Sequence, residues 1–249
     1  MQITSLSKVL SVRGRYSVEI ADTQEEVNKC LQLRYQIFSE EMGAKLKSND
    51  SGLDKDQYDQ YCIHLMVVDH STDKVIATTR LLTSDAAFRA GGFYSESEFN
   101  LSNIIKNNYR YMEVGRTCIH KDYRVGSALP LLWQGIARIV LEQDVDYMFG
   151  CASIPYYGDA KYISSIMHHI KQHHFSDEED RVSPHIPVKM EDDASDDVIL
   201  PTLLKGYLKQ GAQVCGEPYW DAQFGVADVF VLLDCDRIAE RYQRHFVER

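Results

Sequence analysis

The hydrophobic and polar positions of the chain follow two periods, one typical of strands and one typical of helices. Tyr16–Ile20 alternates apolar and polar residues and predicts a short strand. Ser127 to about Gln143 instead has the period of an amphipathic helix. The expected strands are 16–20, 62–69, 75–82, 110–119, 146–152 and 226–233, and the expected helices are 23–41, 101–106, 127–143, 159–174, 200–211 and 236–249.

This order of elements predicts an α/β protein with a central mixed β-sheet flanked by helices. The first helix begins at a capping box, in which Thr23 is followed three residues later by Glu26. No repeat or boundary divides the chain, so we expect a single domain over residues 1–249. Residues 176–197 hold nine acidic and two basic residues and two prolines, which predicts an acidic mobile loop or insertion.

Composition and charge exclude several classes of protein. The chain is 44% hydrophobic and 10% aromatic, which is typical of a globular protein. Its six cysteines lack metal-binding spacing, so we expect no metal site and no disulfide framework. The chain has no basic stripe of the kind that indicates nucleic-acid binding. The acidic segment accounts for most of the net charge of −10, so the remainder of the chain does not exclude an acidic partner.

The apolar stretches are too short for a signal peptide or a membrane span. We therefore expect a cytoplasmic protein, with contact at the inner face of the membrane as an open alternative. The charged terminal helix expected at 236–249 is one segment that would suit such contact.

Several candidate catalytic and cofactor-binding residues lie in Arg110–Gly126. Glu113 and Arg116 lie in an apolar strand, where charges are costly unless they are paired or used. A regular strand would point them to opposite faces, whereas a bulge at Gly115 would bring them to one face. The polar turn that follows leads into a helix N-terminus, which favours an anionic cofactor arm. A purely structural Glu–Arg pair is the alternative.

Further candidates are spread over the first third of the chain. Arg34 and Phe38 share one face of the first helix, and Arg80 needs a partner within its apolar strand. Asp56 and Asp59 lie in a polar segment that lacks the ligand pattern of a calcium loop. They line a pocket for a cation or are solvated.

With these residues in place, the chain resembles the GNAT acyltransferases. Their phosphate-binding turn, Gln/Arg-x-x-Gly-x-Gly/Ala, is degenerate here, with Tyr123 at the first position. The resemblance implies that Arg124, Gly126 and Ser127 contact a phosphopantetheine arm. The departure at Tyr123 favours an acyl carrier protein over CoA as the carrier of that arm.

Two branches of acyltransferases provide closer resemblances. The chain resembles the ornithine-lipid N-acyltransferases over roughly residues 30–245, in DQYDQYCIHLMVVD, EVGRTCIHKDYR, FGCAS, LLKGYLKQGA and ADVFVLLD. It is also similar to the acyl-homoserine-lactone synthases in the order and spacing of Arg34, Phe38, Asp56, Asp59, Arg80, Glu113 and Arg116.

The resemblance implies transfer of a long-chain 3-hydroxyacyl group from acyl carrier protein to the α-amine of an amino acid, with ornithine expected as the acceptor and a lyso-ornithine lipid as the product. An α-amine with a reference pKa near ~8 is less costly to deprotonate than a side-chain amine near ~10.4. Glu113 is the expected general base, and Arg116 orients it or binds a carboxylate. The cosubstrate is an acyl-phosphopantetheine thioester, and no permanently bound cofactor is expected.

The other site residues have implied roles in substrate binding. Arg34 and Arg80 anchor a carboxylate or the pantetheine region, with Phe38 beside them. Asp56 and Asp59 complement the δ-ammonium of ornithine or fix those arginines, and Ser153 is a candidate for the acceptor or pantetheine site.

Three other interpretations of the function are open on the sequence alone. They are a synthase with a different acceptor, as in the acyl-homoserine-lactone synthases, a covalent route through Cys118 or Cys151, and an acyl-thioester-binding module without catalysis.

Overall fold

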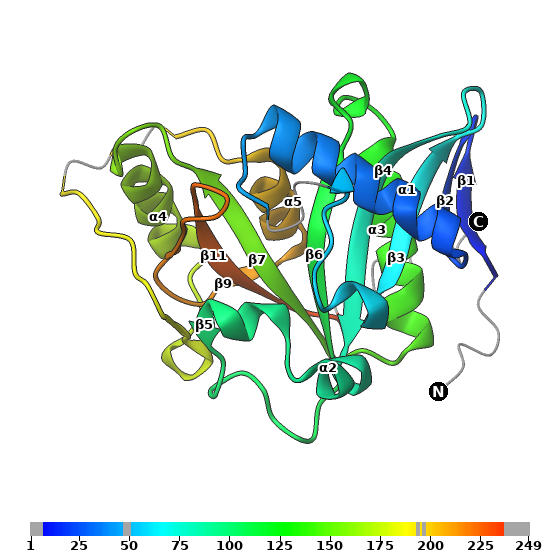
Figure 1. Cartoon of the computed structure of the whole chain (residues 1–249). Helices are drawn as coiled ribbons and strands as arrows, with labels where there is room; N and C mark the ends of the chain where they lie inside the picture. The colour runs from blue at the N-terminus through cyan, green and yellow to red at the C-terminus, as the bar shows by residue number, and fades with distance from the viewer. Residues whose placement is uncertain (1–6, 47–50, 193–194, 196–197, 237–249) are drawn as a thin grey trace. The chain divides into compact units, whose positions relative to one another are not determined.

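The computed structural model describes residues 7–46, 51–192, 195 and 198–236 of the chain (Figure 1). The chain forms two compact units, the first comprising 1–90 and 114–145 and the second comprising 91–113 and 146–249. Strand β6 (Tyr111–Ile119) contributes its first three residues to the second unit and the others to the first. The single domain expected over 1–249 stays a prediction.

The first unit contains a sheet with the strand order β1-β2-β3-β4-β6. Successive strands from β1 to β4 are antiparallel. The prediction for β2 is confirmed at both ends, and those for β3 and β4 are confirmed to within one residue. Strand β1 was not predicted; its sequence VLSVR contains apolar residues, but none of its side chains is buried. The bounds are β1 Val9–Arg13, β2 Tyr16–Ile20, β3 Ile63–Asp69 and β4 Lys74–Thr83.

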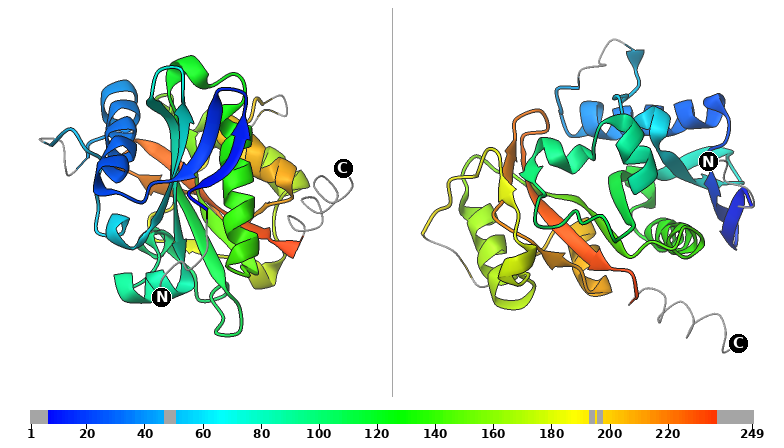
Figure 2. Two further views of the ribbon diagram at one scale, coloured as in Figure 1. Left: turned by 90° about the vertical axis from the view of Figure 1, so that its right-hand side faces the viewer. Right: turned by 90° about the horizontal axis from the view of Figure 1, so that it is seen from below.

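Two helices cover the opposite faces of this sheet (Figures 1 and 2). Helix α1 (Gln24–Tyr35) begins with the predicted capping box and continues as a π-helical turn, η1 (Gln36–Glu41), where one uninterrupted helix was expected. Helix α3 (Ala128–Glu142) packs on the other face. Gly135 allows this close approach, since a Cβ there would lie 2.7 Å from Cγ2 of Val18.

The second unit contains a mixed set of strands. The start of β6 pairs in parallel with β7 (Tyr147–Pro155), and β7 pairs antiparallel with β11 (Val226–Asp234) along its whole length. Strand β10 (Tyr219–Asp221) and the short β9 (Gln213–Val214) pair with β11. The α/β class with a mixed sheet is therefore confirmed.

The helices of the second unit agree with the sequence in part. The predictions of α4 (Lys161–His173) and α5 (Thr202–Gln210) are confirmed, and α5 ends at Gly211, whose φ of 97° suits a glycine. The helix expected at 101–106 is wrong, because those residues form turns. The elements missed in this part of the chain are α2 (Ser84–Ala90, in the first unit), the 3-10 turn η4 (Tyr94–Ser97) and β5 (Phe99–Asn100).

Several described residues of the acidic segment contact the rest of the second unit. A short strand, β8 (Ser183–Pro184), pairs with β5, and the N–H of Glu191 donates to Oγ of Ser164 on α4 (2.8 Å). The mobility of this segment stays a prediction. The helix expected at 236–249 lies outside the described residues, apart from Asp236.

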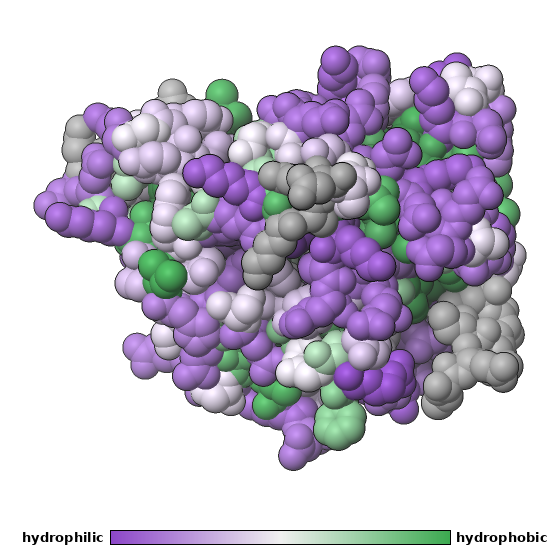
Figure 3. All heavy atoms as spheres, viewed as in Figure 1, coloured by the Kyte–Doolittle hydropathy of each residue, from purple (hydrophilic) through white to green (hydrophobic). Residues whose placement is uncertain are grey.

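Polar side chains cover most of the face that Figure 3 shows, and hydrophobic residues on it form small separate patches. Within the described part of the chain, no helix has the length and apolar character needed to cross a membrane.

Candidate active site

Six charged side chains of the first unit form a buried arginine–aspartate network, comprising Arg34, Arg80, Arg116, Asp54, Asp56 and Asp59. Arg34, in the last turn of helix α1, is only 1% exposed. Its Nε donates to Asp54 (2.8 Å) and its Nη1 donates to Asp59 (2.7 Å). Because three cations face three carboxylates, burial of these charges is compensated within the network.

Arg80 and Arg116 complete the network from strands β4 and β6. Nη1 of Arg80 donates to both Asp56 (2.7 Å) and Asp59 (2.8 Å). Arg116 makes longer ion pairs, at 3.3 Å to Asp54 and 3.6 Å to Asp56. Its side chain is also more exposed than those of Arg34 and Arg80, at 12%. Arg116 is therefore the most exposed arginine of the network.

Ion pairing dominates the electrostatics of the network. Burial by itself would raise the pKa of Asp59, but the positive charges of Arg34 and Arg80 outweigh it and hold that pKa far below the usual range. The hydrogen bond and charge of its aspartate partners outweigh burial at Arg80 and raise its pKa. Burial lowers the pKa of His64, which favours a neutral ring contacting the Asp59 carbonyl oxygen.

The network brings together most of the residues that the sequence singled out in this half of the chain. Of the two roles expected for Asp56 and Asp59, the structure shows contacts with the arginines. Asp54 was missed as a site residue although it lies in the same polar run, because spacing alone does not tell which of three aspartates turns inward. Phe38 is buried on η1 among the hydrophobic core residues.

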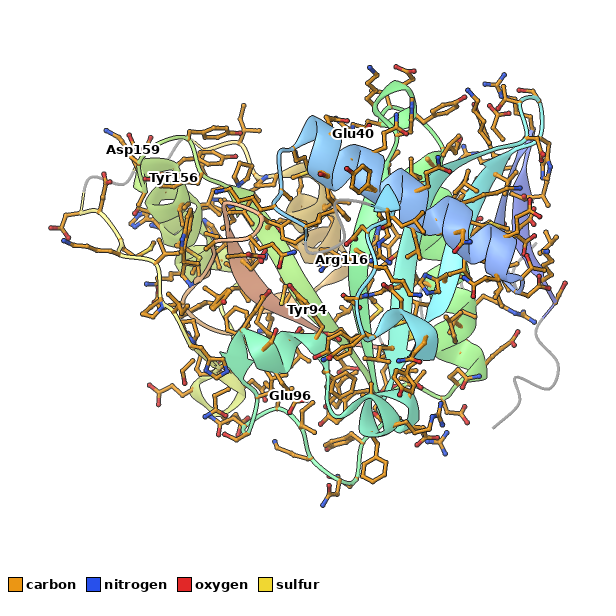
Figure 4. The ribbon with its side chains drawn as sticks, viewed as in Figure 1. Glu40, Tyr94, Glu96, Arg116, Tyr156 and Asp159 are labelled. Carbon is orange, nitrogen blue, oxygen red and sulfur yellow. The ribbon has the colours of Figure 1, made fainter. Side chains whose placement is uncertain are left out.

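The backbone of β6 is distorted where Arg116 lies, and Figure 4 labels this residue on the strand. A bulge at Gly115 was one of two possibilities for this strand, and the positive φ of 53° belongs to the next residue, Arg116. A non-glycine residue in this region costs about 1–3 kcal/mol, so the surrounding contacts must maintain it. One such contact is the hydroxyl of Thr79, which donates to the Gly115 carbonyl oxygen (3.2 Å).

The predicted phosphopantetheine turn lies between β6 and α3. Gly126 has a φ of 127°, a conformation that glycine adopts without strain, and Ser127 directly precedes the helix. Ser127 makes no side-chain capping bond, and Arg124 forms an ion pair with Glu41 (2.5 Å). The turn therefore presents a helix N-terminus, a type of site that binds anions.

Glu113 is buried in the second unit and is held by the turn η4. Its carboxylate accepts hydrogen bonds from the N–H of Tyr94 (2.8 Å), the N–H of Ser95 (2.7 Å) and the hydroxyl of Ser95 (2.5 Å). Figure 4 labels Tyr94 on this turn. These three donors fix the orientation of the carboxylate, and no pattern in the sequence singled out Ser95.

A cluster of carboxylates in the second unit was not predicted. Glu98, Asp221 and Asp228 are buried, and one oxygen from each lies within 4.8 Å of the others, a spacing that a metal ion could bridge. Oγ of Ser153 donates to Oδ1 of Asp228 (2.6 Å), which places the predicted Ser153 at this cluster. The available signal was Asp228, a charge within the apolar run of β11.

The cysteines considered for a covalent route are buried thiols. Burial raises the pKa of Cys118, and burial together with the charge of Glu98 raises that of Cys151. The hydroxyl of Ser95 lies 3.3 Å from Sγ of Cys151. Because the thiolate is the reactive form, these surroundings disfavour nucleophilic catalysis by either residue.

Comparison with known proteins agrees with this fold. A family model described as an acetyltransferase (GNAT) domain matches residues 33–134. The structure of FeeM, an N-acyl amino acid synthase from uncultured soil microbes, is similar over 91% of this chain and 94% of its own, with 10% identity and a TM-score of 0.56. The AHL synthase LasI is similar over 88% and 90% of the two chains, with 12% identity and a TM-score of 0.52.

The fold is that of the GNAT class, and the family model matches part of the chain. Among relatives of known activity, the L-ornithine N(alpha)-acyltransferase of Brucella abortus (strain 2308) is 31% identical over 96% of this chain and 91% of its own length. The chain belongs to the family of L-ornithine N(alpha)-acyltransferases, and it is an amide-forming enzyme. The predicted family, fold and enzyme class are thus confirmed.

Proposed function

We propose that the protein transfers a long-chain 3-hydroxyacyl group from acyl carrier protein to the α-amine of L-ornithine, which gives a lyso-ornithine lipid. The observation that carries this proposal is the 31% identity with a named L-ornithine N(alpha)-acyltransferase over nearly the whole chain. The choice of the α-amine also follows from its lower reference pKa, near ~8 against ~10.4 for a side-chain amine.

In the proposed reaction, the amine nitrogen attacks the thioester carbonyl, a C–N bond forms, and the C–S bond breaks. The amine loses one proton to Glu113, directly or through a water molecule, and the leaving sulfur takes up a proton as a thiol. Glu113 suits a base because its carboxylate is fixed by Tyr94 and Ser95 and does not need to reorganise.

Arg116 is proposed to bind the carboxylate of the acceptor. A planar guanidinium matches a carboxylate, and Arg116 is the most exposed arginine of the arginine–aspartate network. Arg34 and Arg80 would hold the aspartates that position it. The distortion of β6 at Arg116 supports a further role for the backbone N–H groups near residues 113–116, which would stabilise the oxyanion.

The donor arm is proposed to bind at the turn before α3, through Arg124, Gly126 and the N–H groups that follow Ser127. Tyr123 occupies the position where CoA-dependent relatives carry Gln or Arg, and this difference favours acyl carrier protein over CoA. Contact with a membrane surface belongs to the same proposal, because the product would carry a long apolar chain.

The test is an assay of purified protein with 3-hydroxyacyl thioesters on acyl carrier protein and on CoA, with single amino acids as acceptors. Fragmentation of the product by mass spectrometry locates the acylated nitrogen. We expect Nα-acyl-ornithine, made faster from the carrier protein. Acylation of the δ-nitrogen, or no transfer to any amino acid by folded protein, would refute the proposal.

Glu113→Gln alone cannot assign the base, because its amide nitrogen would face an N–H donor of Tyr94 or Ser95. The pH profile of kcat/KM for Glu113→Asp should therefore be measured beside it. If Glu113 is the base, the part of the profile in which kcat/KM rises with pH should shift to another pH. If its role is purely structural, kcat/KM should fall by the same factor at every pH.

A further inference from the structure

Glu98, Asp221 and Asp228 form a carboxylate triad in the second unit, and the pairing of the strands brings two of them to one face. Asp228 on β11 lies opposite Ser153 on β7 and opposite Tyr219 on β10. Asp221 follows Tyr219 by two residues, so its side chain points to the same face. Glu98 reaches the triad from the end of η4.

One atom of the triad has no protein partner in the described part of the chain. Oε2 of Glu98 is buried and accepts no hydrogen bond from the described residues, and the whole residue is 3% exposed. A buried polar atom without a partner is costly, so such an atom points to a ligand. Other oxygens hold the triad in place, since Oδ1 of Asp221 accepts from the N–H groups of Gln223 (2.7 Å) and Phe224 (3.1 Å).

We propose that this triad binds the side-chain ammonium of the acceptor amino acid and so selects an acceptor with a cationic side chain. The inference rests on the proposed function, in which the acceptor is ornithine and its α-amine reacts. An alkylammonium has three N–H donors and no acceptor, and the triad offers one oxygen from each of three carboxylates. A calcium ion would require six or more oxygen ligands.

One neighbour of the triad reaches the surface, since Ser153, which donates to Asp228, is itself exposed. A neutral side chain at this place would leave the carboxylates without a cation. Sites that lose such partners discriminate strongly against the wrong substrate.

The charge state of Glu98 couples this site to pH. The groups that face it are Asp228, Asp221, Cys151, Tyr94 and Tyr219. Burial, followed by the negative charge of Asp228, raises the pKa of Glu98 to about 8. Burial and the neighbouring carboxylates therefore favour the protonated form of Glu98, and an ammonium bound at the triad would favour its ionised form.

The experiment compares L-ornithine with L-norvaline, which has the same carbon chain without the terminal amine. Wild type, Glu98→Gln and Asp228→Asn are assayed with both acceptors between pH 6.5 and 9. Asp234→Asn, an exposed position on the same strand, is the control. Since both acceptors react through an α-amine, the ratio of their kcat/KM values isolates the side-chain contact.

We expect each triad variant to lower kcat/KM for ornithine about 10- to 100-fold, the range for charge-assisted hydrogen bonds, with norvaline changed less than about 3-fold. The wild-type ratio should rise with pH through about 8, and the rise should be lost in Glu98→Gln. An unchanged ratio in both variants, or an equal loss with both acceptors, would overturn the inference.

Two further outcomes separate this inference from the proposed function. If EDTA abolishes transfer to both acceptors and Mg²⁺ or Ca²⁺ restores it in wild type only, the triad is a metal site and the inference is wrong. If wild type acylates no amino acid, the proposed function fails. Calorimetric titration of ornithine then decides the triad: binding lost in both variants supports it, and equal or absent binding refutes it.

Discussion

Replacing Asp59 by asparagine tests whether the arginine–aspartate network depends on a balance of buried charges. Asp59 accepts from Arg34 (2.7 Å), from Arg80 (2.8 Å) and from the N–H of Asp56 (2.8 Å), and its side chain is 2% exposed. The substitution keeps the volume but leaves three buried arginines with two carboxylates. Removal of one partner from a buried ion pair costs about 3–5 kcal/mol, so we expect a loss of stability of that size at pH 7.

The pH dependence provides a sharper check on the same variant. Because the pKa of Asp59 is lowered on folding, its contribution to stability is complete above the unfolded value near 3.8 and is lost as the pH falls. The difference between wild type and Asp59→Asn should therefore shrink below about pH 4, by about 1.4 kcal/mol per pH unit.

Urea unfolding followed by circular dichroism at pH 7, 4 and 3 measures these differences. Asp73→Asn is a matched control, since Asp73 is exposed and its φ of 55° suits asparagine equally well. A loss below about 1 kcal/mol at pH 7, or a loss that does not change with pH, would refute the reasoning.

Two other substitutions test packing and burial. Gly135→Ala should lower stability by about 1–3 kcal/mol, because the new Cβ would lie 2.7 Å from Val18, and thermal unfolding equal to wild type would contradict that packing. Glu98→Gln should stabilise the protein at pH 8 in the absence of acceptor. Folding raises the pKa of Glu98 from 4.5 to about 8, so the stability of wild type falls as the pH rises through that window. The loss in wild type is about 5 kcal/mol at most. Parallel stability curves for the two proteins between pH 5 and 8 would show that the triad does not disfavour the ionised Glu98.

Much of the local structure was predictable, because the period of apolar residues and the chemistry of helix ends act over short distances. The capping box at Thr23, the strand Tyr16–Ile20 and the helix end at Gly211 follow from a few adjacent residues. The errors have local causes as well. Strand β1 lacks a buried face, and the polar segment 83–109 has weak periodicity, which hid α2 and η4.

The residues of the candidate site were also predictable only in part. That Arg80, Glu113 and Arg116 need partners follows from the sequence, because a charge within an apolar strand is costly wherever the strand lies. The family also follows from the sequence, through motifs spread over most of the chain.

Which partners these charges have depends on the folded arrangement of distant segments. Asp54 and Asp59 bind Arg34 although they lie 20 and 25 residues further along the chain. Glu113 binds Tyr94 and Ser95, which lie in a turn whose sequence has no periodic signal. Alternation fixes the face on which a side chain lies, but not the residue opposite it. Strand register and loop closure decide that second choice, and both depend on packing between segments that are distant in the sequence.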